Sequence, residues 1–346
     1  MMATPISVPV ALPKDKAPDK KIIRQIIGTL LTREWPFVHP DSLAMAYHTS
    51  SGNAHCPPLK VFIKFHKETG AEIEIFKHLV PGKHKEALFC YEYGQIGLGA
   101  KVYGFFKTQD GAFGRIDEFL DARNLQPEDV ENAIIRADIA RGLTQLHAMK
   151  NSLKKKAIEL YYGAIINGLD SYHKMDKLKA LGREGGVNVD ALIDYNFGAR
   201  LRKVVNRLKS MGGKTGLCIH DVQFMNVLVK NDPKKGESKI TLVDFEFVMQ
   251  NYRAFDIGEH FMQKMFKWFN AENKLADCRK YTKEERYTSV LMESELGYLL
   301  AITFDVHNML CIMYEEDDKN PLNLIGLNKL FDEFMDQYTK LGLEGL

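Results

Sequence analysis

The sequence has few cysteines, few tryptophans and almost no excess of charge of either sign. Its 346 residues include five Cys and two Trp, and 47 Lys and Arg stand against 45 Asp and Glu. The cysteines lie far apart, without a C-x-x-C pair or metal-type spacing with His, which is typical of reduced thiols in a cytoplasmic protein. A net charge of +2 with no basic run interleaved with aromatics excludes nucleic-acid binding driven by bulk charge.

The sequence also has little that could enter a membrane. The one long apolar stretch, Leu296–Tyr314, is interrupted in its middle by Asp305, His307 and Asn308. Because a charge at that depth would be costly, we expect a buried helix and no membrane insertion. Residues 1–20 have no basic segment ahead of an apolar core, and prolines break their short apolar run. They are expected to form a disordered tail rather than a signal peptide.

The order of elements predicts two lobes. In residues 21–119 we expect two helices, with strands before and after the second helix. The expected helices are Lys21–Thr32 and Gly82–Gly94; the expected strands are Leu43–His48, Leu59–His66, Lys101–Phe106 and Phe113–Asp117, with a turn cluster at Ser50–Pro58. This order indicates a small α+β lobe with an antiparallel sheet that would bind the nucleotide.

Residues 120–346 predict a larger, mostly helical lobe. A connector at Glu118–Asn124 precedes it, and Ile135, Ile139, Leu143 and Leu146 then fall on one face of a helix. Further helices are expected over about 153–175 and 190–210, and from Phe255 onward. Three short strands lie among them, at Leu217–Ile219, Asn226–Val229 and Lys239–Val243. We expect this lobe to hold the catalytic and substrate-binding residues.

The residues richest in chemistry lie between Leu217 and Asn251. Asp221 follows a strand, Asn226 comes five positions later, and Asp244 closes the next apolar strand. Phosphoryl transfer needs such a set, because one carboxylate orients the attacking hydroxyl while an amide and a second carboxylate hold the metal ion on the phosphates; the spacing matches a known kinase template. The alternative is that these residues form turns and cap a strand.

Three segments around these residues carry a resemblance. His220–Leu228 (HDVQFMNVL), Asp244–Phe247 (DFEF) and Asn251–Phe261 (NYRAFDIGEHF) together resemble the choline/ethanolamine kinase family. Its members carry H-N-D-x-Q-x-x-N-I-L, D-F-E-Y and N-x-x-x-F-D-I-x-N-H-F. The resemblance extends to Val61–Phe65 and Glu86–Phe105, and it implies a two-lobed, protein-kinase-like fold.

The resemblance also implies roles for individual residues and the cofactors ATP and Mg²⁺. Asp221 would be the catalytic base, with Gln223 beside it, and Asn226 and Asp244 would be the Mg²⁺ ligands. Lys64 would reach the ATP phosphates and pair with Glu86. Adenine would contact the backbone of Asp117, Glu118 and Phe119, and the phosphates would contact Ser42. The substrate would contact Asp221, Phe247, Gln263 and Trp268. Asp256 and His260 would support the loop.

Several of these residues have simpler interpretations. Lys64 could be a solvated lysine on a strand, and Glu86 could only complement the N-terminus of its helix. Asp256, with Glu259 three residues later, fits a helix-capping arrangement as well as loop support. We expect His260 to be a hydrogen-bonded core histidine rather than a catalytic one.

The chain departs from the family pattern in four places. Ile219 occupies the position of the family histidine, and His220 immediately precedes Asp221. The segment His39–Met45, which we expect to form the first hairpin, contains no glycine, and only Ser42 could donate to a phosphate. The family tryptophans of a late helix fall near Val306 and Met309, and Gln263 replaces an acidic residue. Tyr298, or Tyr314 with Glu315, could complete a partial cage around an ammonium group.

The sequence therefore favours an ATP-dependent kinase of a small-molecule amino alcohol, choline or ethanolamine. That reaction is the first step of phosphatidylcholine and phosphatidylethanolamine synthesis. Two alternatives remain open: a kinase of another small hydroxyl compound, and a catalytically weak, pseudokinase-like binding protein. The resemblance also suggests a homodimer.

Overall fold

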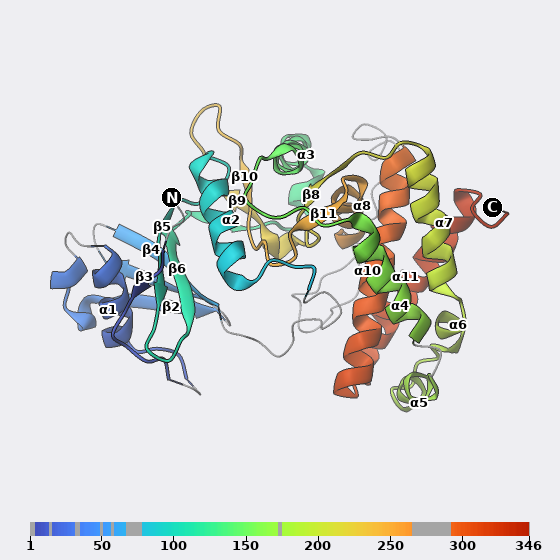
Figure 1. The fold of residues 1–346 in the computed structure, drawn as a ribbon, viewed down its shortest axis with the longest axis horizontal. Helices are drawn as coiled ribbons and strands as arrows, with labels where there is room; N and C mark the ends of the chain where they lie inside the picture. Colours follow the sequence, from blue (N-terminus) through green and yellow to red (C-terminus); the bar gives the residue numbers. More distant parts are fainter. Residues whose placement is uncertain are drawn as a thin grey trace.

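The computed structural model describes residues 4–13, 16–31, 35–48, 51–56, 59–66, 78–171, 175–264 and 292–345. A smaller lobe built around a β-sheet lies at one end of the molecule, and a group of long helices lies at the other (Figure 1). Short sheets and helix α3 (Ala133–Ala148) lie between them. This arrangement confirms the expected two-lobed α+β fold.

Six strands form the sheet of the small lobe, in the order β1-β5-β6-β4-β3-β2. Neighbouring strands are antiparallel except for β1 and β5. The strands are Ile6–Ser7 (β1), Ala44–His48 (β2), Ser51–Cys56 (β3), Leu59–His66 (β4), Val102–Lys107 (β5) and Phe113–Glu118 (β6). Helices α1 (Lys20–Leu30) and α2 (Lys83–Gln95) and short 3-10 helices at Trp35–Phe37 and Pro40–Ser42 belong to the same lobe.

The alternation of side chains along β4 decides where its lysine lies. Val61, Ile63 and Phe65 are buried in one apolar cluster with Ile23 and Ile26 of α1. Because successive side chains of a strand point to opposite faces, residue 64 must lie on the other face of the sheet. Helix α2 packs there, so β4 presents Lys64 to α2.

The expectation of a disordered tail is wrong for residues 4–13. Strand β1 pairs with Phe106 and Lys107 of β5, and the amide N–H of Val8 donates to the carbonyl of Lys107 at 2.9 Å. Val8 and Val10 are buried. Proline is tolerated in this segment because β1 lies at an edge of the sheet and needs hydrogen bonds on one side only.

The expectation of a turn cluster at Ser50–Pro58 is also wrong, because Ser51–Cys56 forms strand β3. Its composition is polar and includes Gly52, which is unusual for a strand. Pairing with β2 on one side and β4 on the other supplies the hydrogen bonds that stabilise it. These inter-strand hydrogen bonds, rather than the intrinsic β-propensity of its residues, explain why this segment is a strand.

The connector from the small lobe joins a sheet of the large lobe. Strand β7 (Ala122–Asn124) pairs with β9 (Val227–Lys230), which pairs with β10 (Ile240–Leu242). Strand β8 (Thr215–Cys218) pairs with β11 (Met249–Tyr252). The loop between β8 and β9 is therefore fixed at both ends by sheets.

Helices make up most of the large lobe. Besides α3 they are α4 (Ile158–Ser171), α5 (Asp176–Glu184), α6 (Asp190–Ile193), α7 (Phe197–Ser210), α8 (Ala254–Gln263), α10 (Met292–Glu316) and α11 (Pro321–Lys340), with 3-10 helices at Asp129–Glu131 and Phe224–Asn226. Helix α10 is long and apolar enough to cross a membrane, but 72% of its apolar window is buried inside the protein. It is therefore a core helix, as its interrupted apolar sequence predicts.

Helices α8 and α10 approach closely at two glycines. A Cβ atom on Gly258 would lie 2.2 Å from the backbone nitrogen of Tyr298, and one on Gly297 would lie 1.9 Å from the carbonyl oxygen of Ala254. Such contacts can be relieved only by moving backbone, because the obstructing atoms are not side-chain ends. This close approach sets the position of α8 relative to α10.

We predict that Gly297→Ala lowers the free energy of unfolding by about 1–3 kcal/mol, because the added methyl group overpacks the α8–α10 contact. Urea unfolding measures the change. The matched control is Gly163→Ala in α4, where a Cβ atom meets nothing within 4 Å. That control should stabilise the protein by about 0.5–1 kcal/mol, since alanine favours a helix. Equal effects of the two substitutions would contradict the packing argument.

Candidate active site

The loop between β8 and β9 brings three of the expected site residues together. The side-chain amide of Asn226 donates to Oδ2 of Asp221 at 2.6 Å and to its carbonyl oxygen at 3.1 Å. The amide of Gln223 donates to the same Oδ2 at 3.0 Å. Both amides therefore orient one carboxylate oxygen of Asp221.

The residue that closes the neighbouring strand reaches this loop. The N–H of Val243 donates to the carbonyl of Asn226 at 3.0 Å, so the next residue, Asp244, lies beside the loop. Asp244 has a positive φ of 63°, which is unusual outside glycine and is concentrated at functional sites. Phe245, which follows, packs edge-to-face on Phe89 and Tyr93 of α2.

Lys64 joins the two lobes. Its Nζ lies 3.2 Å from Oε1 of Glu86 and 2.6 Å from Oδ1 of Asp244. Burial by itself would lower the pKa of Lys64, but the carboxylates of Glu86 and Asp244 outweigh it and raise that pKa. The lysine is therefore charged, and it connects β4, α2 and the segment after β10.

Glu86 is completely buried and lies among several cations. Besides Lys64, the guanidinium of Arg115 lies 3.6 Å and the ammonium of Lys83 lies 3.8 Å from its carboxylate oxygens. Arg115, also buried, donates to Asp117 at 2.8 Å. A carboxylate that only complemented a helix N-terminus would stay near the surface, so this geometry favours the ion-pair interpretation of Glu86.

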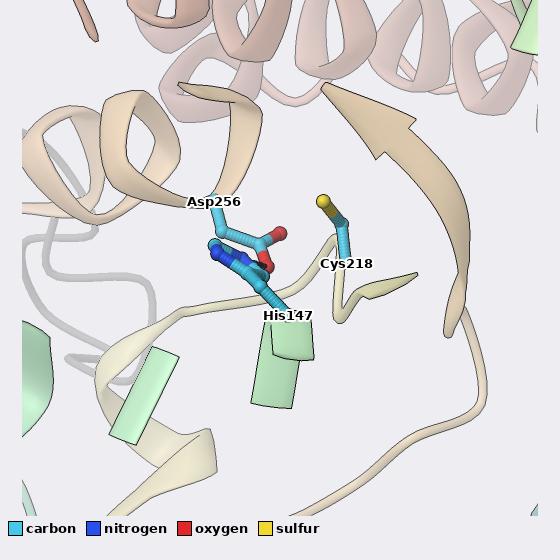
Figure 2. A group of neighbouring side chains, drawn as sticks. All are labelled: His147, Cys218 and Asp256. Carbon is cyan, nitrogen blue, oxygen red and sulfur yellow. Dashed lines mark hydrogen bonds and ion pairs between the residues drawn. The ribbon is translucent and has the colours of Figure 1, made fainter. Parts of the chain in front are cut away.

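A second set of buried groups supports the loop from behind. The two carboxylate oxygens of Asp256 accept the backbone N–H groups of Ile219 at 3.0 Å and His220 at 3.1 Å. Nε2 of His147 lies 2.8 Å from Oδ2 of the same aspartate. Figure 2 shows these two side chains beside each other. Asp256 thus fixes the backbone immediately before Asp221.

The same group could in principle hold a metal ion, because ligand atoms of His147, Cys218 and Asp256 all lie within 4.8 Å of one another (Figure 2). Both oxygens of Asp256, however, already accept hydrogen bonds. Burial also raises the pKa of the Cys218 thiol well above its usual value, whereas a metal ligand must be a thiolate. The arrangement therefore fits a hydrogen-bonded support and not a metal site.

His220 supplies hydrogen bonds of its own to the loop. Its Nδ1 lies 3.1 Å from the carbonyl of Cys218, and its Nε2 lies 2.7 Å from the side-chain amide of Asn251. A neutral ring with its proton on Nδ1 satisfies both contacts. Its backbone has a positive φ of 61°, and its buried ring packs against Tyr161 and Phe255. It thus lies on the support side of the loop.

Helix α8 contacts the loop through two neighbouring residues. The backbone of Val222 hydrogen-bonds to both Glu259 and His260. Both side chains are buried, and Oε2 of Glu259 has no hydrogen-bond partner within the described part of the chain. His260 lies against the loop, as expected of a structural histidine. Burial and the carboxylates of Asp221 and Asp256 raise the pKa of Glu259 well above its usual value.

A further carboxylate near Asp221 belongs to helix α10. Burial, with the Asp221 carboxylate as a second cause, raises the pKa of Asp305 to about 7. Burial also raises the pKa of Asp221, and Asp244 and Glu246 act in the same direction. The site therefore gathers several carboxyl groups around Asp221, and a cationic ligand would favour their charged forms.

The other expected contact residues lie as follows. Phe247 is half-buried, and its ring centroid lies 6.4 Å from that of Phe304 on α10. Gln263 is buried at the end of α8, one helical turn after Glu259. Trp268 lies outside the described residues. The N–H of Glu118 donates to the carbonyl of Lys101 at 2.8 Å, and Phe119 packs under the ammonium of Lys60.

The expected position of the first hairpin is wrong. His39–Met45 contains a 3-10 helix, Pro40–Ser42, that packs against α1, and Leu43 is buried in the cluster on the α1 side of the sheet. The structure therefore does not bring Ser42 to Lys64. The hairpin that precedes the lysine strand is β2–β3, where Tyr47 pairs with Gly52, so a glycine does stand at this hairpin.

The structure reveals contributors that the sequence analysis missed. Arg115 and His147 lie in ordinary strand and helix patterns, so nothing in their spacing indicated a role. Asn251 begins one of the three segments that carry the family resemblance, but the sequence analysis gave it no role. Asp305 did give a signal, since it interrupts an apolar helix.

Oxygen ligands suited to Mg²⁺ come from Asn226 and from Asp244, whose side chain is 35% exposed.

Comparison with known proteins agrees with this geometry. A family profile described as Choline/ethanolamine kinase matches residues 77–291. A human choline/ethanolamine kinase is 27% identical over 175 residues, which are 51% of this chain and 41% of that protein. The matched region thus spans less than half of that relative.

Solved structures show the same fold. An ethanolamine kinase of Plasmodium vivax superimposes with a TM-score of 0.63 at 19% identity and covers 94% of both chains. The choline kinase LicA of Streptococcus pneumoniae gives a TM-score of 0.56 at 14% identity and covers 91% of this chain and 99% of its own. LicA has also been solved in complex with AMP.

We predict that acid destabilises the protein partly through His220. Burial lowers the pKa of His220 to about 4, while the unfolded chain should titrate near about 6.5. Between these values the unfolded state binds more protons, so the stability present above pH 6.5 is lost as the pH falls.

Urea unfolding at pH 7 and pH 5 tests this. Wild type should lose about 2 kcal/mol more than His220→Asn between the two values. The quantity to compare is the change in the free energy of unfolding between pH 7 and pH 5, because the substitution can also change the stability at both pH values. An identical pH dependence in the two proteins would show that the ring is not held neutral.

Proposed function

The chain belongs to the choline/ethanolamine kinase family, and from this premise we propose that it transfers the γ-phosphoryl group of ATP to the hydroxyl of a small amino alcohol. The product would be a phosphomonoester that serves phosphatidylcholine or phosphatidylethanolamine synthesis. A cytoplasmic location and a homodimer remain proposals of the same kind.

One observation carries the proposal. Lys64 bridges Glu86 of α2 and Asp244, while Asp244 lies beside the loop that holds Asp221 and Asn226. These residues come from four separate segments, and a turn-forming or strand-capping role would not require them to meet. A lysine held by a buried glutamate next to two carboxylates and an amide is the set that kinases use to position phosphates and the attacking hydroxyl.

Asp221 would act on the acceptor alcohol. Its carboxylate would accept a hydrogen bond from the hydroxyl, align the oxygen with the γ-phosphorus, and take the proton as the new P–O bond forms. The bond from the γ-phosphorus to the bridging oxygen breaks, and ADP leaves with that oxygen. The raised pKa of Asp221 suits a proton acceptor, and the amides of Gln223 and Asn226 would hold its other oxygen still.

The nucleotide would lie between Lys64 and the connector. Lys64 would reach the phosphates with the charge that Glu86 maintains, while the backbone after β6 would contact adenine. Asp117 pairs with Phe62 and Val102 inside the sheet, and Glu118 N–H is already bonded to Lys101. Among Asp117, Glu118 and Phe119, we therefore expect the backbone of Phe119 to contact adenine. Mg²⁺, when bound, would neutralise phosphate charge, and Asn226 and Asp244 would hold it. That LicA binds AMP supports a nucleotide site in this fold.

We propose that the acceptor is an amine that carries N–H groups. Asp305 adds a carboxylate near Asp221, whereas Val306 and Met309 stand where the family resemblance places tryptophans. A quaternary ammonium is recognised mainly by aromatic faces, but a primary ammonium gains charge-assisted hydrogen bonds to carboxylates. We therefore propose ethanolamine rather than choline, with Asp305 as the partner of its ammonium group and Phe247 beside it.

We predict that Asp221→Asn lowers kcat by about 100-fold or more, because it removes the proton acceptor. Formation of the phosphomonoester from MgATP and ethanolamine measures the rate. The control is Asp332→Asn, which makes the same carboxylate-to-amide change at an exposed aspartate of α11. It should leave kcat unchanged. Near-normal turnover by the folded Asp221→Asn protein would exclude this residue as the base.

A methylation series tests the acceptor. We expect kcat/KM to fall from ethanolamine through its mono- and dimethyl derivatives to choline, since each methyl group removes a hydrogen-bond donor. Asp305→Asn should lower kcat/KM for ethanolamine about 10–100-fold, the loss of one charge-assisted hydrogen bond, and change that for choline much less. An equal effect on both substrates would contradict the assignment, and activity only on an unrelated hydroxyl compound would favour the alternative kinase.

A binding protein without activity is the less favoured alternative. Its main support was the absence of glycine from His39–Met45, and that segment does not form the hairpin before the lysine strand. Lys64, Glu86, Asp221, Asn226 and Asp244 also lie together as an active kinase requires. We therefore propose an enzyme.

A further inference from the structure

A cleft of about 560 Å³ lies outside the catalytic constellation. Its walls come from four parts of the chain: the segment leading into α2, the end of α3 with the residues that follow it, strand β8 and strand β11. Neither Lys64 nor Asp117–Phe119, Asp221 or Asp244 lines it. It is therefore separate from the proposed ATP and acceptor sites.

The Lys and Arg side chains in the wall of this cleft give it a positive charge. Six Lys and Arg side chains line it, and no Asp or Glu is among the described residues of its wall. The cations are Lys85, Lys150, Lys154, Lys155, Lys156 and Arg253. The whole chain balances 47 basic against 45 acidic residues, so this is a local concentration of positive charge.

Two of the cations are held in place by uncharged groups. Nζ of Lys156 donates to the carbonyls of His78 and Leu79, the latter at 3.1 Å, and Nε of Arg253 donates to the carbonyl of Thr215 at 3.1 Å. Burial, and then the neighbouring Lys85, lower the pKa of Lys156. These lysines therefore repel each other, and an anion between them would relieve the repulsion.

One carboxylate close to the lysine-rich segment is not part of the cleft wall. Glu92 of α2 lies close in space to the segment after α3, but its Oε2 accepts the backbone N–H of Ser152 at 3.0 Å. Lysines on a convex loop would spread into water and bind nothing in particular. Here they surround a concave cleft, where low-dielectric walls focus the positive potential.

We propose that this cleft is a binding site for a phosphate-bearing polyanion, either a free oligophosphate or the phosphorylated headgroup of an anionic lipid. Six cations match a ligand with several negative charges, and Arg253 can offer its guanidinium nitrogens to phosphate oxygens. The volume is sufficient for three linked phosphates or a phosphorylated ring. Binding at this site requires no catalytic turnover, so the proposal stands apart from the kinase reaction.

Titration calorimetry with inorganic tripolyphosphate tests the site directly. The full chain should bind it, and affinity should fall steeply as NaCl rises, because salt screens the attraction between exposed charges. Lys154→Ala/Lys155→Ala should weaken binding at least about tenfold, whereas the matched pair Lys234→Ala/Lys235→Ala should not. Both pairs are adjacent, exposed lysines, so each variant changes net charge equally and should remain folded.

A third variant separates the cleft from the ATP site. Lys64→Ala should leave tripolyphosphate binding unchanged if the anion occupies the cleft. Loss of binding in Lys64→Ala protein that circular dichroism shows to be folded would overturn the proposal. An equal loss in the two double variants, or no binding by wild type at low salt, would also overturn it.

Vesicles distinguish the two sources of the anion. Wild type is sedimented with phosphatidylcholine vesicles that contain or lack a phosphatidylinositol bisphosphate. Binding to the phosphorylated vesicles that Lys154→Ala/Lys155→Ala abolishes and tripolyphosphate displaces would identify a lipid headgroup. Binding of tripolyphosphate alone would identify a free oligophosphate. Vesicle binding that the double variant leaves intact would contradict a role of this cleft at membranes.

Discussion

The ion-paired lysine between the lobes is the interaction on which the site depends. Lys64 contacts Glu86 of α2 and Asp244 of the large lobe, so one ammonium group fixes three segments that are distant in sequence. Glu86 is fully buried, and an unpaired carboxylate there would cost about 3–5 kcal/mol. The need to neutralise that charge holds α2 against β4. The same ammonium group pairs with Asp244, which the backbone bond between Val243 and Asn226 places beside the loop that carries Asp221.

Support of the loop follows the same logic of satisfying buried polar groups. Asp256 accepts two backbone N–H groups and pairs with His147, while His220 bonds to Asn251 and to a carbonyl. Each of these buried donors thus meets an acceptor, and the backbone before Asp221 is fixed. Asp221 is therefore oriented before any substrate arrives, which is what positioning and proton transfer require.

Local patterns in the sequence predicted the lobes, α2, the lysine strand and the loop with Asp221, Asn226 and Asp244. They failed where long-range pairing decides the structure. Strand β3 is polar and forms because β2 and β4 flank it. Because its sequence does not predict a strand, the first hairpin was expected at His39–Met45, with Ser42 near the phosphates. Arg115 and Asn251 gain their contacts only in the folded chain. Asp305 could be noticed as a charge in an apolar helix, but not as a neighbour of Asp221.

Phosphorus NMR on purified protein with MgATP and ethanolamine tests the central claim most directly. Wild type should convert the γ-phosphate signal into a phosphomonoester signal with an equal amount of ADP. Glu86→Gln should do so far more slowly, because Lys64 then loses its buried partner. Unchanged ATP in the presence of folded wild type, ADP with inorganic phosphate alone, or full activity in Glu86→Gln would contradict the account.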